Sequence, residues 1–466
     1  MIAGLVFALL GASPTEPMSD LMPSAAVVPT AKVIDLTVSR VTGSTVTLGW
    51  TEVDNGAGRP ASYRLKYAEP PIAWRTATIG CAPTITGTRI GARMSCTVAG
   101  LSQATTYDFQ LMSFRLTSTG AWQGAVYSNI ARGQTAAPVV ATATGGGGGI
   151  WISPAELARL PTSGSAWTNL LANANRSCGT VDLADQEDLT NVCVMAKALV
   201  FARTGTASYR TAVVTALTEI VGSATYSGRA LALGRELAAY VIAADLIGLE
   251  TFNPTLDAAF RTKIRVLRDA PTTEAGTLRE CHERRPNNWG THCGGSRAAI
   301  AAYLGDTAEL ARIAQVFKGW LGDRSSYAGF TYGDLSWQCN SSRQVGINPA
   351  GCTRNGRSID GVIPDDQRRA GGFSWPAPQE NYVWEALQGA LVQAVILHRA
   401  GYPVWDWENR ALLRAVTWLH NENDYPAEAD DTWQPHVINH YYGTSFPAPV
   451  PARAGKNVGW TDWTHR

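Results

Sequence analysis

The sequence is poor in charge. Charged residues make up 17% of its 466 residues, and 39 basic residues face 38 acidic ones, so that the formal net charge is +1. Such a balance leaves no extended basic field for nucleic acid and no acidic tail. Beyond the first ten residues, no segment reaches the roughly 18 uninterrupted apolar residues that a transmembrane helix needs. We therefore expect neither nucleic acid nor a membrane as a partner.

Metal-binding signatures are also missing. Neither a CxxC pair nor an HExxH motif occurs in the chain. His436 and His440 are four residues apart, which on a helix places both on one face, but a zinc site needs at least a third ligand. We therefore expect no metal and no cofactor.

The eight cysteines fall into four local couples. An even number at close spacing predicts four disulfides, and disulfides need an oxidising compartment. The couples are Cys81 with Cys96, Cys178 with Cys193, Cys281 with Cys293, and Cys339 with Cys352.

The first residues favour export. A short apolar run from Ile2 to Leu10 precedes Gly11-Ala12-Ser13, as in a signal peptide and its cleavage site, although the usual basic start is missing. Residues 1–13 are thus interpreted as a signal-peptide-like segment, and residues 14–30, rich in Pro, Ser and Ala, as a flexible leader. The expected location is extracellular.

Residues 31–135 predict a small antiparallel β-sandwich. Apolar and polar residues alternate in several short runs, and Gly, Asn, Asp and Pro separate them. The stretches 48–50, 63–67 and 101–109 resemble the B, C and F strands of a fibronectin type III domain. That resemblance implies that Trp50 is the core tryptophan and Tyr107 the tyrosine corner. It also implies a spacer or accessory module without catalytic residues.

Residues 136–149 are rich in Ala, Thr and Pro and end in five glycines, which predicts a flexible linker. After it, the apolar period becomes helical. About nine helices, mostly joined by short turns, predict an all-α domain over residues 150–466, stacked as an (α/α) toroid or solenoid. Helices are expected at residues 187–203, 209–221, 229–246, 256–268, 296–304, 307–321, 380–399 and 407–420.

Four segments of this domain concentrate polar, ionisable and aromatic residues. The first is the loop expected between Cys281 and Cys293, the second is residues 433–443, the third is residues 375–382, and the fourth is the long Gly/Ser/Arg-rich connection at residues 325–378. Long connections on a helical scaffold usually carry function. In the fourth segment, Arg343 is a candidate for holding a sugar carboxylate with two hydrogen bonds.

The helical part resembles the alginate-lyase-like superfamily. The resemblance covers most of residues 150–445 and is carried by residues 152–160, 196–205, 240–248 and, most specifically, Asn287-Asn288-Trp289-Gly290. It implies an incomplete (α/α) toroid with a substrate groove that cleaves uronic-acid polysaccharides by β-elimination. In that reaction the sugar carboxylate is neutralised, a base removes the C5 proton, and an acid protonates the departing O4.

The resemblance implies that Asn288 neutralises the carboxylate. The family motif continues with His where this chain has Trp289, so the base falls to His292 or to the downstream His440. Tyr441 and Tyr442 are the candidate acids, with Tyr382 in reserve. The expected substrate-binding residues are Arg285, Asn287, Trp289, Arg297, Arg343, Gln379, Asn381 and Tyr382.

The leading hypothesis is therefore a secreted, monomeric lyase acting on an acidic polysaccharide such as alginate, glucuronan or a related exopolysaccharide. One alternative is a glycoside hydrolase on a similar scaffold, which needs two carboxylates, drawn from Asp365, Asp366 and Glu380. The other alternative is a non-catalytic polysaccharide-binding protein.

Overall fold

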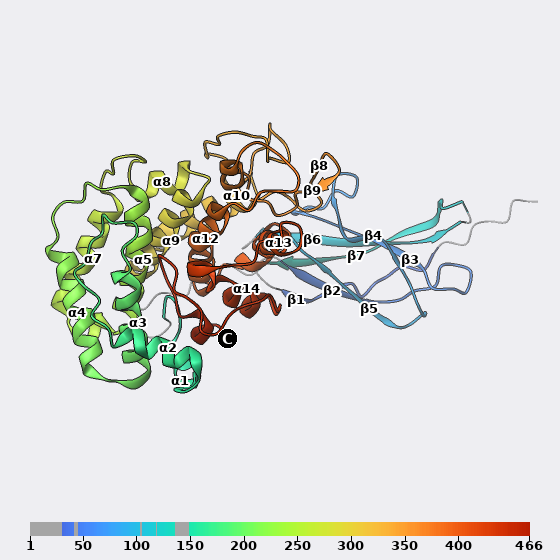
Figure 1. Ribbon diagram of the computed structural model, residues 1–466. Coiled ribbons are helices and arrows are strands. Elements are labelled where there is room, and N and C mark those ends of the chain that lie inside the picture. The colour runs from blue at the N-terminus through green and yellow to red at the C-terminus, as the bar shows by residue number, and fades with distance from the viewer. Residues whose placement is uncertain (1–29, 42–44, 103–104, 118, 136–148) are drawn as a thin grey trace, which may run out of the picture. The chain divides into compact units, whose positions relative to one another are not determined.

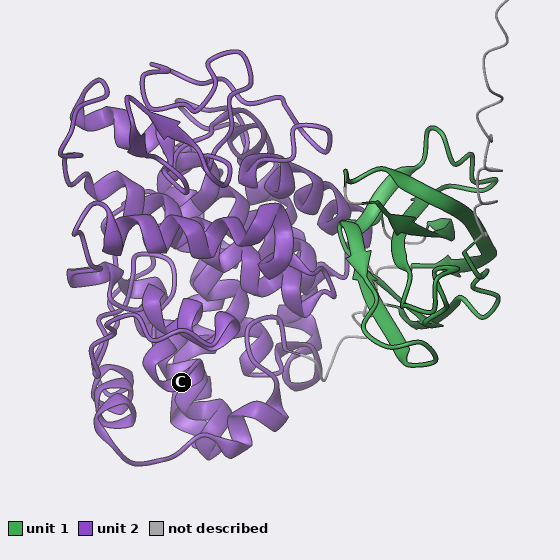
Figure 2. Cartoon of the chain, turned by 90° about the vertical axis from the view of Figure 1, so that its right-hand side faces the viewer, with its two compact units in different colours: residues 1–137 green, residues 138–466 purple. Residues whose placement is uncertain are grey.

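The computed structural model describes residues 30–41, 45–102, 105–117, 119–135 and 149–466. The chain forms two compact units, residues 1–137 and 138–466 (Figure 2). The expected signal-peptide-like segment, the leader up to residue 29 and the linker up to residue 148 lie outside the described residues.

Unit 1 is a sandwich of two antiparallel sheets (Figure 1). One sheet has the order β1-β2-β5 and the other the order β4-β3-β6-β7. The strands are β1 Thr37–Val41, β2 Val46–Thr51, β3 Ser62–Ala68, β4 Thr78–Thr86, β5 Arg93–Val98, β6 Thr106–Leu116 and β7 Trp122–Gln134.

The core of unit 1 lies between these two sheets. Trp50 of β2 is fully buried and packs edge-on against Tyr63 of β3. The Tyr107 hydroxyl accepts a hydrogen bond of 3.0 Å from the backbone N–H of Ser102, which is the expected tyrosine corner. The disulfide Cys81–Cys96 joins β4 to β5 and so ties one sheet to the other.

Unit 2 is largely helical. Its longer helices match the expected ranges within a few residues, except that α9 starts earlier, as described below, and that α2 and α14 had no expected range. They are α2 Ser165–Ala174, α3 Thr190–Thr204, α4 Ala207–Gly222, α5 Ala230–Leu246, α7 Pro254–Arg268, α9 Asn288–Leu304, α10 Thr307–Leu321, α12 Asn381–Arg399, α13 Trp407–Asn421 and α14 Gln434–Tyr442. Short helices include α1 Pro154–Arg159, α6 Leu249–Phe252, α8 Leu278–Arg284, α11 Pro364–Gln367 and α15 Thr461–Thr464.

Four helices form an inner row. In the order α3, α5, α9 and α12 they lie side by side (Figure 1). Nearly every residue of α5, α9 and α12 is buried, so these helices have apolar contacts all round. Helices α4, α7, α10 and α13 bury only one face each and cover the inner row from outside.

Helix α9 begins eight residues earlier than the sequence predicts, at Asn288. The segment expected to be a loop between Cys281 and Cys293 is therefore α8, a short connection and the first turns of α9. Glycines made this start hard to see, because glycine disfavours helix. Here glycines allow the two helices to pack closely. A Cβ on Gly294 of α9 would lie 2.5 Å from the Gln393 side chain of α12, and a Cβ on Gly389 of α12 would lie 2.3 Å from the His292 backbone nitrogen of α9.

The other cysteines pair as predicted. The disulfides Cys178–Cys193, Cys281–Cys293 and Cys339–Cys352 all lie within unit 2. The long connection after α10 is ordered around buried side chains: Trp337 is fully buried and donates from Nε1 to the Gly371 carbonyl.

The C-terminal segment folds back onto the inner row. Trp460 and Trp463 are buried, and their indole N–H groups donate to the carbonyls of Val192 and Pro161. This return places Lys456 beside α12, which matters for the site below. In the part of the chain that the structure describes, no helix combines the length and the apolarity that a membrane crossing requires.

The glycine contacts of α9 give a first prediction. Gly389→Ala should destabilise unit 2 by about 1–3 kcal/mol, towards the upper end because backbone atoms must move. Gly222→Ala is the matched control, since a Cβ there meets nothing within 4 Å, and it should be neutral or stabilising by about 0.4–1 kcal/mol. Urea unfolding of both variants measures the difference, and equal stability would contradict this account of the packing.

Candidate functional site

The site is built on the first turn of α9. Asn287 caps the helix, since its side-chain oxygen accepts from the Trp289 backbone N–H. The backbone N–H of Asn288 donates to Asp366 Oδ1 at 3.0 Å. The side-chain amide of Asn288 is fully buried, yet neither its oxygen nor its nitrogen has a hydrogen-bond partner. Buried amides are nearly always paired, so this one is available for a ligand.

Asp366 lies on α11 and is as buried as Asn288. Burial raises the pKa of its carboxyl well above the usual value, and the neighbouring Asp365 raises it further. The uncharged form of the carboxyl, which can donate a hydrogen bond, is therefore favoured more than in an exposed aspartate. Its Oδ2 has no partner, and neither has Oε1 of the adjacent Gln367. Asn288 and this carboxyl thus lie together.

Tyr382 is an exposed aromatic side chain near Asn288 and Asp366. It lies in the first turn of α12 and keeps 37% of its surface accessible. The guanidinium of Arg369 lies 3.5 Å from the centroid of its ring. Arg369 follows Asp366 by three residues, so this contact links the buried pair to the surface.

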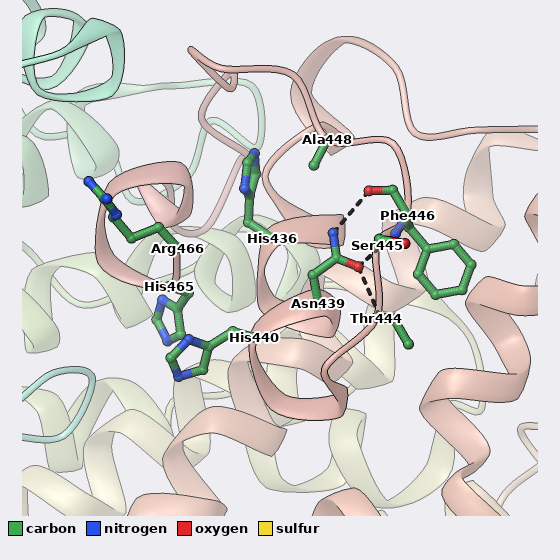
Figure 3. A pocket seen from close by; sticks show the side chains of 9 residues that line it. All are labelled: His436, Asn439, His440, Thr444, Ser445, Phe446, Ala448, His465 and Arg466. Atoms are coloured by element: carbon green, nitrogen blue, oxygen red, sulfur yellow. Dashed lines mark hydrogen bonds between the residues drawn. The ribbon is translucent and has the colours of Figure 1, made fainter.

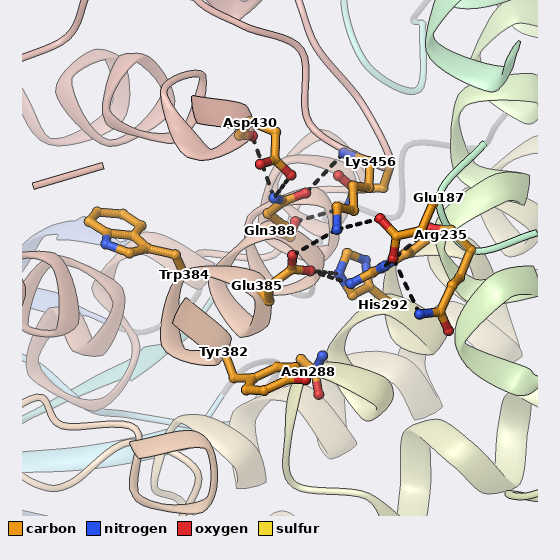
Figure 4. A network of polar contacts seen from close by, with 12 residues as sticks. Glu187, Arg235, Asn288, His292, Tyr382, Trp384, Glu385, Gln388, Asp430 and Lys456 are labelled. Carbon is orange, nitrogen blue, oxygen red and sulfur yellow. Dashed lines mark hydrogen bonds and ion pairs between the residues drawn. The ribbon is translucent and has the colours of Figure 1, made fainter. Parts of the chain in front are cut away.

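Helices α9 and α12 run in the same direction. Gly389 approaches the backbone of His292, and Gly294, two positions further along α9, approaches Gln393, four positions further along α12. His292 Nε2 lies 3.6 Å from Glu385 Oε2. Asn288 is one turn before His292, and Tyr382 is about one turn before Glu385. The two side chains accordingly lie at the same end of the helix pair (Figure 4).

An ionic network lies one turn further along α9 and α12 (Figure 4); its Arg235 and Glu385 are buried, and its Glu187 is exposed. Arg235 of α5 binds Glu385 directly and Glu187 at 3.0 Å, while Lys456 binds Glu187 at 2.7 Å and Glu385 at 3.3 Å. Although burial opposes the charge, bonding to His292 and the cations lowers the pKa of Glu385 to about 2. Burial lowers the pKa of His292 to about 4, so its imidazole is neutral at pH 7.

His440, Tyr441 and Tyr442 belong to a different place. They lie on α14, and the ring of Tyr441 is 5.0 Å from that of His398 near the C-terminal end of α12. Tyr382 and His398 are about 24 Å apart along α12 at 1.5 Å per residue. The structure therefore does not bring His440 or either tyrosine next to Asn288. Sequence spacing carries no information on such distances.

The remaining candidates are dispersed. Arg297 is buried and bound to Glu309 at 2.7 Å and Glu283 at 3.0 Å, so its guanidinium is used within the fold. Trp289 is half-buried, with the Arg229 guanidinium 4.8 Å from its ring.

Of the other four, Arg285 is exposed and donates to the Glu274 carbonyl, while Gln379 donates to the Asp424 carbonyl. Arg343 is exposed on the long connection, and Asn381 is exposed at the start of α12. Of these four, Gln379 and Asn381 are close to Tyr382 in the chain.

Sequence patterns do not identify several residues of this site. The sequence suggests Asp366 only as a carboxylate of the alternative glycoside hydrolase. It suggests no role for four further residues, Arg235, Arg369, Glu385 and Lys456. For Glu385 the sequence does contain a signal. This residue follows Tyr382 by three positions on a helix that is predicted correctly, so both side chains are expected on the same face of that helix. Within the described residues, no group of three or more His, Cys, Asp or Glu side chains is arranged to hold a metal ion.

Comparison with known proteins bears on unit 1. The family model "Fibronectin type III domain" matches residues 29–128. Residues 29–128 form a fibronectin type III domain. A search of curated proteins finds no match.

Similar solved structures include two isolated domains. The sensor domain of the anti-sigma factor RsgI4 in Pseudobacteroides cellulosolvens is 19% identical, with a TM-score of 0.18, covering 24% of this chain and 99% of that one. The fibronectin type-III domain of human fibronectin type III domain containing protein 3 is 16% identical, with a TM-score of 0.19, covering 26% and 98%.

The neutral His292 predicts a pH dependence of stability. The unfolded chain protonates this residue near pH 6.5, while the native chain does so only near pH 4. The contribution of His292 to the free energy of unfolding is therefore fully present above pH 6.5 and is lost as the pH falls from 6.5 to about 4. Between about pH 7 and pH 5 the native state should lose ~2 kcal/mol through this residue.

Urea unfolding at both pH values tests this prediction. His292→Gln should lose less stability on acidification than the parent chain, by about that amount, whatever its absolute stability. An identical loss in both proteins would show that His292 is not held neutral.

Proposed function

We propose that unit 2 is a secreted polysaccharide lyase that cleaves a uronic-acid polysaccharide by β-elimination. Its inner and outer rows of helices fit the incomplete (α/α) toroid that the sequence resemblance implies. The observation that carries the proposal is the burial of the unpartnered Asn288 amide beside the Asp366 carboxyl, whose pKa burial raises. The four disulfides favour an extracellular protein.

This pair suits the difficult step of the reaction. The C5 proton of a uronate becomes acidic enough to remove only when the charge on the C6 carboxylate is neutralised or delocalised. Amide N–H and carboxyl O–H groups that are already oriented stabilise the developing dienolate, and their effect is strongest where water is excluded. An ionised Asp366 would repel the substrate carboxylate, so its raised pKa is a requirement of the proposal.

Proton transfer falls to Tyr382 and His292. His292 is neutral at pH 7 and can accept the C5 proton, while the Tyr382 phenol can protonate the departing O4. Asn288 is fully buried without substrate, so the substrate has to displace the side chains that cover it. Tyr382 and Arg369 are the exposed side chains beside the pair and the ones that we expect to move.

A hydrolase fits this end of the molecule less well. Hydrolysis needs an ionised carboxylate as nucleophile or base opposite a protonated one. Asp365 is buried and bound to Arg368 at 2.8 Å, and Glu380 accepts from the Tyr382 backbone N–H as the cap of α12. Asp365 and Glu380 are thus engaged in structural bonds, and burial disfavours the ionised form of Asp366.

The test is ultraviolet absorbance of the purified chain with alginates, glucuronan, hyaluronan and pectate. β-Elimination leaves a conjugated double bond at the new non-reducing end, so absorbance should rise with one of these polymers. New reducing ends without absorbance would establish a hydrolase instead. Binding of a polymer with neither signal would establish a non-catalytic binding protein.

Asn288→Ala should separate function from stability. Because the amide has no hydrogen-bond partner to lose, the variant should lose less stability than a variant whose deleted buried amide is hydrogen-bonded. It should lose at least about a hundredfold in the rate of absorbance increase, the scale of removing one such hydrogen-bond donor.

Asn348→Ala is the matched control, because that buried amide bonds to Trp337, Ile359 and Cys339. Removing it should cost about 1–3 kcal/mol or more, and the fraction that remains folded should keep its turnover. If Asn288→Ala is instead the unstable and active variant, Asn288 is a structural residue and the proposed site is wrong.

A further inference from the structure

The second cluster of candidate residues, on α14 and the C-terminal segment, lines a pocket of its own. A pocket of about 570 Å³ is lined by His436, Asn439, His440, Phe446, His465 and Arg466, among others (Figure 3). A smaller one of about 180 Å³ shares His440, His465 and Arg466 with it. His440, His465 and Arg466 thus line both pockets. The pockets lie at the His398 end of α12, about 24 Å along the helix from Tyr382.

The side chains of this region that can carry a charge are mostly basic. The imidazole rings of His440 and His465 are 5.3 Å apart, and His436 and Arg466 line the same pocket (Figure 3). The smaller pocket adds Arg159 and Arg399. Glu156 is the acidic residue that lines it, and this carboxylate is bound to Arg399 at 3.0 Å.

His465 is a buried histidine of this basic region. His465 is 4% exposed, and burial, followed by the nearby His440 and Arg399, lowers its pKa to about 3. Groups of the same sign therefore oppose one another here, and a negative ligand would relieve that repulsion. Its Nδ1 lies 2.8 Å from the Thr464 hydroxyl, which fixes the ring in place.

The pocket is also preformed and partly aromatic. The Asn439 side chain bonds to Thr444 and to both backbone groups of Phe446, which holds the loop after α14 in place. The ring of Tyr441 stacks on Trp405 at 4.1 Å and lines the smaller pocket. Fixed cations beside flat apolar rings suit a ring-shaped ligand that carries an acid group.

We infer that this pocket binds an oxyanion through His440, His465 and Arg466, with the carboxylate of a sugar acid as the ligand that its aromatic walls favour. The inference does not depend on the lyase proposal. Binding of an oxyanion needs no catalysis, and the residues that line this pocket lie at the end of α12 opposite to Asn288.

Isothermal titration of the full chain at low salt, where electrostatic attraction is least screened, provides the test. Glucuronate and sulfate should both bind, and glucose, which has the same ring without the acid, should not. Binding of glucuronate at least about tenfold tighter than sulfate identifies a sugar acid, and equal affinities identify a free oxyanion.

Variants locate the binding. Arg466→Gln and His440→Gln should each weaken it about tenfold, because each removes one hydrogen-bond donor to the anion. Arg210→Gln is the matched control, since Arg210 lies over Phe252 elsewhere in unit 2, and it should leave the affinity unchanged. The absence of binding by both anions would overturn the inference, as would binding that survives both pocket variants and disappears in Asn288→Ala.

Discussion

The close packing of α9 between α5 and α12 fixes the positions of the site residues. Glycines allow it, because a Cβ on Gly234, Gly294 or Gly389 would collide with the facing helix. Such an approach buries α9 almost completely, including polar residues that would otherwise face water. Asn288 and His292 are consequently held in surroundings of low dielectric, where an uncharged amide and a neutral imidazole are the stable forms.

The same burial makes the ionic network necessary. A lone Glu385 beside His292 would be costly, and Arg235 and Lys456 compensate its charge from two other parts of the chain. A buried pair of this kind adds little net stability, but removing one partner leaves an uncompensated charge. Since Lys456 comes from the C-terminal segment, the packing of Trp460 and Trp463 supports the site as well as the fold.

The local patterns of the sequence predicted the elements well and their assembly less well. Period-two and helical apolar spacing located the strands around Trp50 and most of the helices, and proximity located the four disulfides. The start of α9 was missed because its glycines act through tertiary contacts that a single helix cannot reveal. His440 and Tyr441 were grouped with Asn288 because spacing along the chain does not show that they lie at opposite ends of α12. The unpartnered amide of Asn288 and the raised pKa of Asp366 are likewise properties of the folded chain alone.

The geometry of α9 bears on the departure at Trp289. Successive residues on a helix point about 100° apart, so a residue at position 289 faces away from Asn288, while one at position 292 faces nearly the same way. Trp289 accordingly contacts Arg229 at the side of α9, and His292 lies under Asn288 towards Glu385. In our proposal the base therefore lies one turn further along α9 than the family motif implies. Under this proposal a base at that depth reaches only a substrate that has moved the Tyr382 and Arg369 side chains aside, so substrate entry would be coupled to proton removal.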